Sequence, residues 1–438
     1  MKLSYYLVIE ELENESFIYY STYSNKSILL NKRIHSILQN SKIDFELLNI
    51  NLIKLLIEYS ILVNNDINEL ERIIKENKTN INNSEHFYIA ILPTSSCQMG
   101  CDYCGQTHSN EKISNNIINK ILDFIDIKLS EKKYSNLTVG WFGGEPLIQI
   151  KMISEASIDL IKLANKYNIT YTAHMASNGL LLNSRNLEIL STCKIISIDV
   201  TLDGTKELHD VSRKLKNGKT SFDKIIKNLE NFTQSNLDIN ISIRTNVHKE
   251  NFNDIFNLYN LLKEKKILNK CRYYITQVHA WGNDAHNISL SPNEFAELET
   301  KLLLTMIKDG FNSKLIPDRN FEVCMVVNKN TYIFDHIGNA FSCSELPLVE
   351  KNYDLEKVKE FNINDHNILD VKTKQRLFYN WNDKILNSES KSPCSKCVLL
   401  PICGGGCPKN WSEEKGNCPS FKYNFNNRLK LQYYEIKN

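Results

Sequence analysis

Three cysteines fall close together in the segment CQMGCDYC: Cys97, Cys101 and Cys104. Thiols clustered at such short spacings are typical of metal ligation. Three thiolates on one loop can hold three irons of a four-iron cubane and leave the fourth iron open for an exchangeable ligand. A zinc loop is the alternative, although zinc prefers four closed ligands and usually shows two CxxC pairs.

A second and larger set of cysteines lies toward the C-terminal end of the sequence. Its members are Cys324, Cys343, Cys394, Cys397, Cys403, Cys407 and Cys418. Because their region has weak periodicity, we expect it to be organised by bound metal more than by a large apolar core. A pair of structural zinc sites is the alternative. The remaining two cysteines, Cys193 and Cys271, lie in or near expected strands, where buried structural thiols are expected.

The composition restricts the setting in which these cysteines act. The chain has 438 residues, of which 42% are hydrophobic and 24% charged, with a formal net charge of +2. This near-neutral balance gives no reason to expect a nucleic-acid partner. A membrane span needs about 18 apolar residues, and no apolar run approaches this length. The N-terminus lacks the apolar core of a signal peptide. We therefore expect a cytoplasmic protein whose thiols stay reduced.

Residues 87–310 alternate between strand and helix patterns. The candidate strands are FYIAILP, LTVGWFG, TYTAHMAS, IISIDVTL, INISIRTNV and CRYYITQVH. Segments between them, such as NNIINKILDFIDIKLSE, space their apolar residues as helices do. Six β–α units in series predict an α/β fold, a partial (β/α)6 barrel with a parallel sheet. Ligands of such a barrel bind at the carboxyl ends of the strands.

Several motifs stand at the ends of these expected strands. They are Gly143, Gly144, Glu145 and Pro146 in GWFGGEP, Ser177 and Asn178 in MASNG, Asp203 in TLDG followed by His209, Asp210 and Arg213, Arg244 and Asn246 in IRTNV, and His279, Trp281, Asn283 and Asp284 in QVHAWGNDA. Glycines let a backbone approach a ligand, a carboxylate complements an ammonium, and Arg suits a carboxylate. Alternatively, the glycine pair is a tight turn, and Asp203, His209 and Asp210 cap loops. Substrate contacts are expected at the last motif.

The N-terminal residues have a different pattern. The segments YYLVIEEL, SFIYYST and KSILLN alternate apolar and polar residues and predict a small antiparallel sheet. Helical spacing follows, so residues 1–75 are expected to form a compact, winged-helix-like α+β module. The polar, Asn-rich residues 76–86 are expected to be a linker.

The spacing CxxxCxxC, with Tyr103 before the last cysteine and GGEP after the next strand, resembles the radical S-adenosylmethionine (SAM) superfamily. The resemblance implies that Cys97, Cys101 and Cys104 bind a [4Fe–4S] cluster whose open iron chelates the methionine part of SAM. Reductive cleavage of SAM then gives a 5′-deoxyadenosyl radical that abstracts a hydrogen atom. The implied cofactor contacts are Tyr103 at the adenine, Gly143, Gly144, Glu145 and Pro146 at the methionine amino group, Ser177 and Asn178 at the ribose, and Arg213 at the carboxylate.

The seven C-terminal cysteines resemble the SPASM domain of peptide-modifying radical enzymes, and with the barrel the resemblance covers residues from about 87 to 425. It implies a domain over residues 311–425 with two auxiliary [4Fe–4S] clusters, so three clusters in all, and a C-terminal tail over residues 426–438. By position, Cys394, Cys397, Cys403 and Cys418 would hold one auxiliary cluster, and Cys324, Cys343 and Cys407 the other. Some relatives have a further cysteine where this chain has Asp318.

The N-terminal module resembles the recognition element of maturases that act on ribosomally synthesised peptides (RiPPs), which adds a leader peptide to a sheet edge. A structural cap on the barrel is the alternative. Together the resemblances imply an oxidoreductase that forms a carbon–carbon or thioether cross-link in a precursor peptide, with a low-potential electron donor such as flavodoxin or ferredoxin. One alternative is a sulfatase-type maturase that oxidises Cys or Ser to formylglycine. The other is a non-catalytic metal-cluster protein that only binds peptides.

Overall fold

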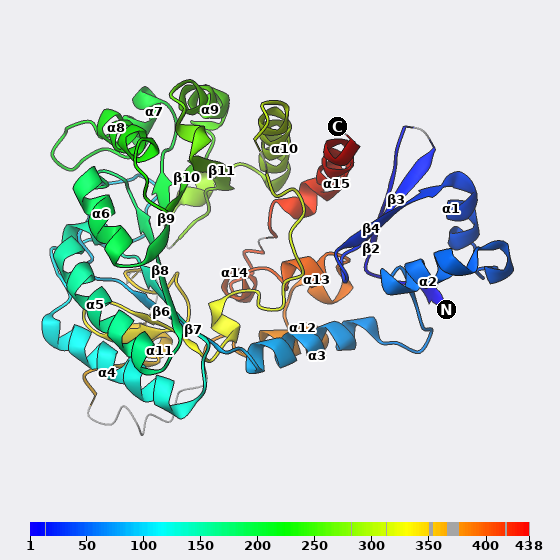
Figure 1. The fold of residues 1–438 in the computed structure, drawn as a ribbon, viewed down its shortest axis with the longest axis horizontal. Coiled ribbons are helices and arrows are strands. Elements are labelled where there is room, and N and C mark those ends of the chain that lie inside the picture. The colour runs from blue at the N-terminus through cyan, green and yellow to red at the C-terminus, as the bar shows by residue number, and fades with distance from the viewer. Residues whose placement is uncertain are drawn as a thin grey trace. The chain divides into compact units, whose positions relative to one another are not determined.

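A computed structural model of the chain describes residues 1–437 except 14, 282, 312, 350–353, 366–375 and 417. The chain forms two compact units, each assembled from separate stretches of sequence (Figure 1). The first unit comprises Met1–Ser84, Pro292–Lys329 and Phe378–Asn438, and the second comprises Glu85–Ser291 and Asn330–Leu377. Among the described helices, none is long and apolar enough to cross a membrane.

The second unit is built on a sheet in the order β11-β10-β9-β8-β7-β6-β12-β13-β14. The six strands expected from the sequence are β6 (His86–Ile91), β7 (Asn136–Trp141), β8 (Thr170–Ser177), β9 (Ile195–Thr201), β10 (Asn240–Val247) and β11 (Cys271–Gln277). Each pairs in parallel with its neighbours along the chain. The prediction of an α/β fold with a partial (β/α)6 barrel is therefore confirmed.

Helices connect these strands, and α4, α5 and α6 line one face of the sheet (Figure 1). The connecting helices are α4 (Asn115–Glu131), α5 (Ile150–Lys166), α6 (Ser184–Thr192), α7 (Lys206–Ser212), α8 (Phe222–Thr233) and α9 (Ile255–Glu264). In α4, Ser114 caps the N-terminus, and buried Ile118, Ile121 and Ile125 recur at the spacing of one helical face. Apolar burial against the sheet thus sets the position of each helix.

Three further strands extend this sheet beyond the boundary expected at residue 310. They are β12 (Thr331–Phe334), β13 (Asn339–Phe341) and β14 (Phe361–Asn362), and the short helix α11 (Leu355–Val358) lies between the last two. β12 is buried at all its positions and pairs in parallel with the free edge of β6. Residues 330–377 group with the barrel, whereas α10 (Pro292–Lys308) groups with the first unit.

The N-terminal part of the first unit contains the three expected antiparallel strands, in the order β2-β3-β4. Its elements are β1 (Lys2–Leu3), β2 (Leu7–Glu11), β3 (Ser16–Ser21), β4 (Lys26–Asn31), α1 (Lys32–Gln39), α2 (Ile50–Glu58), β5 (Leu62–Val63) and α3 (Glu69–Asn82). β1 and β5 pair separately as a small two-stranded sheet. These elements form the α+β module that the sequence pattern predicts.

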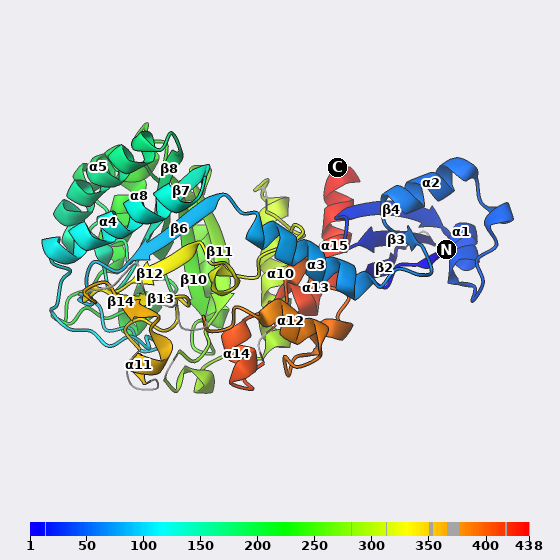
Figure 2. The same cartoon turned by 90° about the horizontal axis from the view of Figure 1, so that it is seen from below.

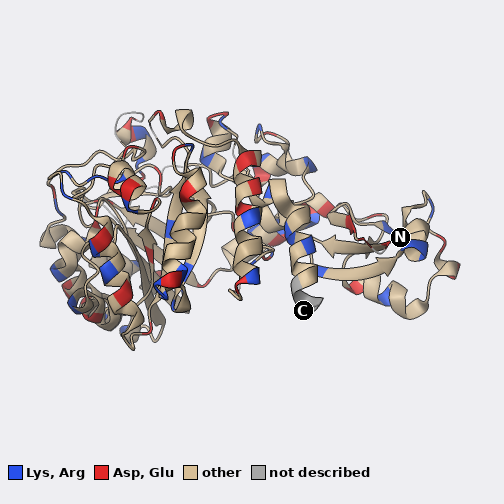
Figure 3. Cartoon of the chain, turned by 90° about the horizontal axis from the view of Figure 1, so that it is seen from above, with Lys and Arg blue, Asp and Glu red and all other residues tan. Residues whose placement is uncertain are grey.

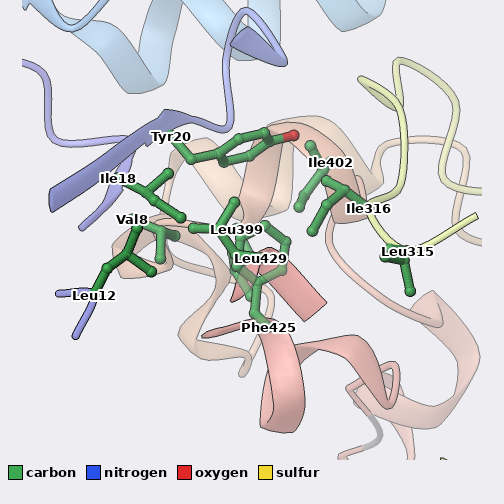
Figure 4. Packing of buried hydrophobic residues seen from close by; sticks show 10 residues of the cluster. All are labelled: Val8, Leu12, Ile18, Tyr20, Leu315, Ile316, Leu399, Ile402, Phe425 and Leu429. Atoms are coloured by element: carbon green, nitrogen blue, oxygen red, sulfur yellow. The ribbon is translucent and has the colours of Figure 1, made fainter. Parts of the chain in front are cut away.

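The central strand β3 departs from simple alternation, because it is buried at every position. Phe17 and Tyr19 pack in an apolar cluster with residues of α1 and α2. Ile18 and Tyr20 point the other way, into a cluster with Phe425 and other residues from the C-terminal end of the chain (Figure 4). A strand covered on both faces is apolar throughout, which explains the run of apolar residues in SFIYYS.

Two segments expected to be irregular are helical. The linker expected at residues 76–86 is largely part of α3, because Ile73, Ile74, Asn77 and Ile81 form one buried stripe of that helix. Residues 426–437 of the expected tail belong to α15 (Phe421–Lys437), where Leu429 is buried with Phe425. In both segments tertiary burial outweighs a polar composition.

The remaining helices of the first unit are short and lie around the C-terminal cysteines. They are α12 (Trp381–Leu386), α13 (Leu400–Cys403) and α14 (Pro408–Ser412). Helix α12 lies along α3 (Figure 2), and Lys78 on α3 forms an ion pair with Asp383 on α12. Lys and Arg are interspersed with Asp and Glu over the helices visible in Figure 3, as a near-neutral chain would have them.

Replacing Phe425 by Ala should lower the free energy of unfolding by about 3–5 kcal/mol, because the ring is 3% exposed and lies 5.5 Å from the Tyr20 ring. Chemical denaturation measures the change. Tyr434, on the same helix and 40% exposed, is the control, and its replacement by Ala should have a small effect. A loss for Phe425→Ala as small as that of the control would show that α15 does not contribute to the core.

Candidate functional site

The loop after β6 carries Cys97, Cys101 and Cys104 as partly buried free thiols. Burial raises the pKa of Cys97, and it raises the pKa of Cys101 to about 12. Without a ligand these two thiols therefore hold their protons, which iron must displace when it binds the thiolates. Among the described residues no three His, Cys, Asp or Glu converge on a single ion position. A four-iron cubane does not require this, since each thiolate binds a different iron.

The cysteine loop, residues 97–105, is held against the segment that contains Arg213. The amide of Gly100 donates to the carbonyl of Lys214 at 2.9 Å, and the amide of Lys216 donates to the carbonyl of Gln98 at 2.9 Å. These paired backbone bonds resemble a short antiparallel ladder. They give the three thiols a defined backbone before any metal binds.

The GGEP loop after β7 runs beside the beginning of the cysteine loop. The amide of Gly144 donates to the carbonyl of Thr94 at 3.1 Å, and the amide of Glu145 donates to the carbonyl of Ser96 at 2.8 Å. A Cβ on Gly144 would lie 2.3 Å from the Ser96 oxygen, and Gly143 has a φ of +114°. Both glycines are thus required by geometry, since larger residues would separate the two loops.

The Glu145 carboxylate is enclosed by protein, with no exposed surface. It accepts hydrogen bonds from the Asn178 amide at 2.7 Å, the Ser177 hydroxyl at 2.9 Å and the Leu147 amide at 3.0 Å. Burial raises its pKa, while these three donors oppose the shift. The side chain therefore ties the GGEP loop to the end of β8. The expected contact of this motif with the ammonium of a bound cofactor stays a prediction. Pro146 is buried at the start of a single helical turn.

Ser177 and Asn178 end β8 close to the first cysteine. The Asn178 side-chain amide lies 3.9 Å from Cys97 Sγ and donates to Gln98 Oε1 at 3.2 Å. The Ser177 hydroxyl also accepts from the Gly179 amide at 3.0 Å, so it is engaged within the protein. The structure thus brings both predicted residues to the cysteine loop.

Tyr103 anchors the other end of the cysteine loop through its hydroxyl. This hydroxyl donates to Asp203 and accepts from Arg213, and Asn246 donates to it at 2.8 Å. Arg213 and Asp203 also form an ion pair at 3.3 Å, with side chains 9% and 0% exposed. Burial raises the pKa of Tyr103 well above its usual value. The ends of β9 and β10 thereby meet the cysteine loop in one buried polar network.

Within the described part of the chain, Arg213 has one donor without a partner, and this donor is available to a ligand. Its Nε atom is buried and has no hydrogen-bond partner, although Nη1 is paired. A buried unpaired donor is costly, so a carboxylate bound beside the cysteine loop would stabilise this arrangement. The residues present therefore fit a cofactor that has a carboxylate.

His209 and Asp210 have structural roles, as one of the two readings of the sequence predicted. His209 is fully buried, its Nδ1 accepts from the Asp203 amide at 3.2 Å, and burial lowers its pKa to about 4. Asp210 accepts from the amides of Ser221 and Phe222 at 2.8 and 3.1 Å, at the start of α8. Asp203 instead belongs to the network with Tyr103.

The face of the sheet that carries Arg244 also has polar side chains that the sequence analysis did not single out, Asp199 and Tyr274. Asp199 accepts from the Tyr274 hydroxyl at 3.2 Å, and Arg244 donates to the Thr201 hydroxyl at 3.2 Å. Tyr274 is opposite Arg244 in the strand register, so both face the same side. Polar residues at every second position of these strands were the available signal, because a core face would be apolar.

The loop after β11 packs directly on the cysteine loop. Asn283 donates to the Tyr103 carbonyl at 2.9 Å, and a Cβ on Gly105 would lie 1.5 Å from the Trp281 carbonyl oxygen. Trp281 in turn donates from its indole to the Glu345 carbonyl at 2.9 Å. This places the expected substrate loop beside the three thiols.

The other two members of that loop lie at its borders. His279 Nε2 lies 3.4 Å from a carboxylate oxygen of Glu345. Asp284 precedes a single helical turn, Ala285–Asn287. The assignment of these side chains to substrate contacts stays a prediction.

Four of the C-terminal cysteines line one cavity, which we call the four-cysteine cavity. They are Cys394, Cys397, Cys403 and Cys418, the same four that the family resemblance groups together. Burial raises the pKa of Cys394 to about 12, and the neighbouring cysteines contribute to this shift. The ammonium of Lys422 lies 3.3 Å from Cys418 Sγ. Four thiols around one cavity are the donor set of a fully ligated four-iron cluster.

The other three C-terminal cysteines are divided between the units: Cys324 and Cys407 belong to the first and Cys343 to the second. Their assignment to one cluster stays a prediction. Asp318, at the position of a further cysteine in some relatives, is exposed and pairs with Lys314. Cys193 and Cys271 are buried in the barrel unit, 2% and 4% exposed, as expected for structural thiols.

Comparisons with known proteins agree with this geometry. Residues 91–262 match the Radical SAM superfamily. A cysteine-type anaerobic sulfatase-maturating enzyme of Clostridium novyi (strain NT) is 26% identical over 369 residues, which cover 79% of this chain and 96% of the relative. A serine-type anaerobic sulfatase-maturating enzyme of Bacteroides thetaiotaomicron is 22% identical over 363 residues, covering 74% of this chain and 83% of the relative.

Two solved structures share the fold. Native anSMEcpe, with bound AdoMet and the Cp18Cys peptide, superposes with a TM-score of 0.57 at 19% identity, covering 79% of this chain and 98% of that one. Streptococcus suis SuiB, bound to its precursor peptide SuiA, superposes with a TM-score of 0.54 at 17% identity, covering 96% of this chain and 98% of that one.

Replacing Asp203 by Ala should cost about 3–5 kcal/mol of folding free energy, because it leaves the buried Arg213 charge without its partner. Denaturant unfolding measures the loss. The matched control is Asp102→Ala, which removes the exposed ion pair with Lys214, the residue that follows Arg213. That variant should be close to wild type, because exposed pairs contribute little. A loss as small for Asp203→Ala would show that the network does not hold the loop.

Proposed function

The chain carries a radical SAM domain homologous to anaerobic sulfatase-maturating enzymes, and from this premise we propose that it is a maturase that forms an intramolecular cross-link in a ribosomally synthesised precursor peptide. Radical SAM enzymes use SAM and a [4Fe–4S] cluster, and the bound cofactor supplies a 5′-deoxyadenosyl radical that takes hydrogen from the substrate. The observation that carries the proposal is the cysteine loop, held by the GGEP loop on one side and by the Tyr103 network on the other.

The chain's own residues would act by holding and enclosing the reactants. Cys97, Cys101 and Cys104 would bind the cluster, and the free Nε of Arg213 would meet the methionine carboxylate. The buried Glu145 would keep the GGEP backbone beside the cofactor. Such positioning, with exclusion of water, is what a protein contributes to radical chemistry that belongs to its cofactor.

A cross-link between two side chains requires the loss of two hydrogens from the peptide. One leaves as a hydrogen atom to the 5′-deoxyadenosyl radical, and the other leaves as a proton and an electron when the new bond forms. The chain must therefore provide an acceptor for that electron. The four cysteines around the four-cysteine cavity, and the set of Cys324, Cys343 and Cys407, are the residues proposed to hold auxiliary [4Fe–4S] clusters for this purpose.

The N-terminal module supports a peptide substrate with a leader segment. β4 is one of the two edge strands of the sheet β2-β3-β4, and its residues are mostly exposed. Edge strands present unpaired amide and carbonyl groups to which an extended peptide can add as a further strand. Leu29 on this strand is 44% exposed and offers an apolar contact.

The extent of the structural likeness is one support for a maturase with an N-terminal module. SuiB, which binds a precursor peptide, covers 96% of this chain, whereas anSMEcpe covers 79%. The difference is comparable to the length of the N-terminal module. The alternative is a sulfatase-type maturase that makes formylglycine, and it is supported by the 26% identity to the Clostridium novyi enzyme over 96% of that enzyme.

Mass spectrometry of the product separates these alternatives. The protein is incubated with SAM, a reductant, and either the peptide encoded beside its gene or a sulfatase-derived Cys or Ser peptide. A cross-link removes two hydrogens and forms no aldehyde, whereas formylglycine has an aldehyde that a hydrazine reagent captures. A hydrazine-reactive product would decide for the sulfatase-type reaction. If the reduced protein does not cleave SAM, the third alternative holds, which is a peptide-binding protein without catalysis.

Anaerobically reconstituted protein should bind about 12 irons, as expected for three four-iron clusters. Replacing Cys97, Cys101 and Cys104 together by Ala should remove about four of them and abolish formation of 5′-deoxyadenosine. The control is Cys193→Ala, which removes a buried thiol outside the proposed ligand sets and should keep the iron content. Zinc with little iron in protein purified without oxygen would contradict the assignment.

Replacing Leu29 by Asp should weaken binding of the full precursor peptide by about tenfold, equivalent to ~1.4 kcal/mol, because a charge is placed on the proposed docking edge. Fluorescence anisotropy of a labelled precursor measures the affinity, and iron content reports folding. Ile158→Asp is the matched control, since Ile158 is 53% exposed on α5 in the other unit. An unchanged affinity for Leu29→Asp would place the leader elsewhere.

A further inference from the structure

The backbone around Cys397 is held by residues that lie at the opposite end of the sequence. The Tyr5 hydroxyl donates to the carbonyl of Lys396 at 2.7 Å. The Thr22 hydroxyl donates to the carbonyl of Val398 at 2.6 Å. The carbonyls of Lys396 and Val398, the residues immediately before and after Cys397, are therefore both bound by the N-terminal module.

The remaining backbone groups of Cys397 are bound within its own region. Its amide donates to the carbonyl of Cys394 at 3.2 Å, and its carbonyl accepts from the amide of Leu400 at 3.0 Å. The peptide unit between Lys396 and Cys397 is thus anchored at both its oxygen and its N–H. The direction of the Cys397 side chain into the four-cysteine cavity follows from this doubly anchored peptide.

Thr22 is itself firmly placed for this contact. It lies in the turn between β3 and β4, has no exposed surface, and donates from its amide to the Tyr6 carbonyl at 3.0 Å. Its hydroxyl has one hydrogen, and Val398 O at 2.6 Å is a nearer acceptor than Tyr6 O at 3.1 Å. The hydroxyl is therefore directed at the cysteine segment.

Apolar packing supports the same contact. Val8, Ile18 and Tyr20 of the N-terminal sheet share one buried cluster with residues of α13 and α15 (Figure 4). Cys397 and Val398 pack against this cluster. A cysteine in such a position cannot shift without opening a shared core, which is close-packed.

We propose that the N-terminal module is a positioning element of the four-cysteine cavity, in which Tyr5 and Thr22 hold the backbone of Cys397 so that its thiol faces the cluster site. This rests on the proposed function, which assigns a [4Fe–4S] cluster to that cavity. Partners that orient a metal ligand without touching the metal typically contribute 10–100-fold to metal affinity. Tyr5 and Thr22 take this role through the backbone. The module thus serves the cluster in addition to any peptide it binds.

The test variant is Tyr5→Phe combined with Thr22→Val, which removes both hydroxyls and keeps the side-chain shapes. The matched control is Tyr20→Phe combined with Thr79→Val. The Tyr20 hydroxyl has no hydrogen-bond partner among the described residues, and the Thr79 hydroxyl bonds only its own helix at the Lys75 carbonyl. Circular dichroism confirms that each variant is folded.

The first measurement needs no cluster. Metal-free protein is alkylated anaerobically, and the rate at each cysteine is followed by peptide mass spectrometry. In the test variant, Cys397 should react about tenfold faster than in wild type, while Cys193 and Cys271 in the barrel unit keep their rates. The control variant should match wild type at all three cysteines. Equal Cys397 rates in the test variant and wild type would overturn the proposal.

The second measurement uses the reconstituted protein. A chelator should remove the iron of the four-cysteine cavity about tenfold faster from the test variant than from the control, followed by electron paramagnetic resonance of the reduced clusters. Thr22→Ser, which keeps a hydroxyl, should lose iron at about the wild-type rate, whereas Thr22→Val, which removes it, should lose iron faster. If Thr22→Val also loses iron at the wild-type rate, the positioning role is wrong. If wild type holds no cluster in this cavity, the proposed function fails there, while the alkylation rates still decide the positioning role.

Discussion

The parallel pairing of β6 to β11 is the constraint on which the candidate site depends. In a parallel sheet every strand ends at the same edge, so loops that are distant in sequence are delivered to one place. The cysteine loop after β6, the GGEP loop after β7, Ser177 and Asn178 at the end of β8, and Asp203 after β9 meet there. Without this topology the motifs would be unrelated short segments.

Buried polar groups then hold the loops together more tightly than a sheet edge alone could. Glu145 accepts three hydrogen bonds inside the protein, and the Tyr103 hydroxyl joins side chains of Asp203, Arg213 and Asn246. Because an unpaired polar group in the interior is costly, such networks have few alternative arrangements. The result is a thiol loop with a defined backbone, which a metal cluster needs if its open iron is to face the cofactor.

A second constraint shapes the first unit, where β3 is covered on both faces. One face packs on α1 and α2, and the other packs on α13, α15 and the segment that carries Cys397. The N-terminal module is therefore continuous with the core around the four-cysteine cavity, and its hydroxyls reach the backbone beside one of the thiols. The sheet keeps two edge strands, β2 and β4, and β4 is the edge proposed to take up a peptide. Under the two proposals, one sheet would serve both a peptide and a metal site.

The sequence by itself determined the alternation of strands and helices, the parallel barrel and the antiparallel N-terminal sheet, because these are encoded by periodicity. The grouping of four C-terminal cysteines was implied by the resemblance to a known domain, and the same four line one cavity. Only the tertiary structure decided what depends on contacts between distant segments. The Glu145 carboxylate is buried because its partner lies at the end of another strand. Residues 76–82 are helical because their apolar stripe is buried. β12 joined the barrel because the edge of β6 was open to it. Thr22 reaches the carbonyl of Val398 across 376 positions, and no local pattern encodes a contact of that range.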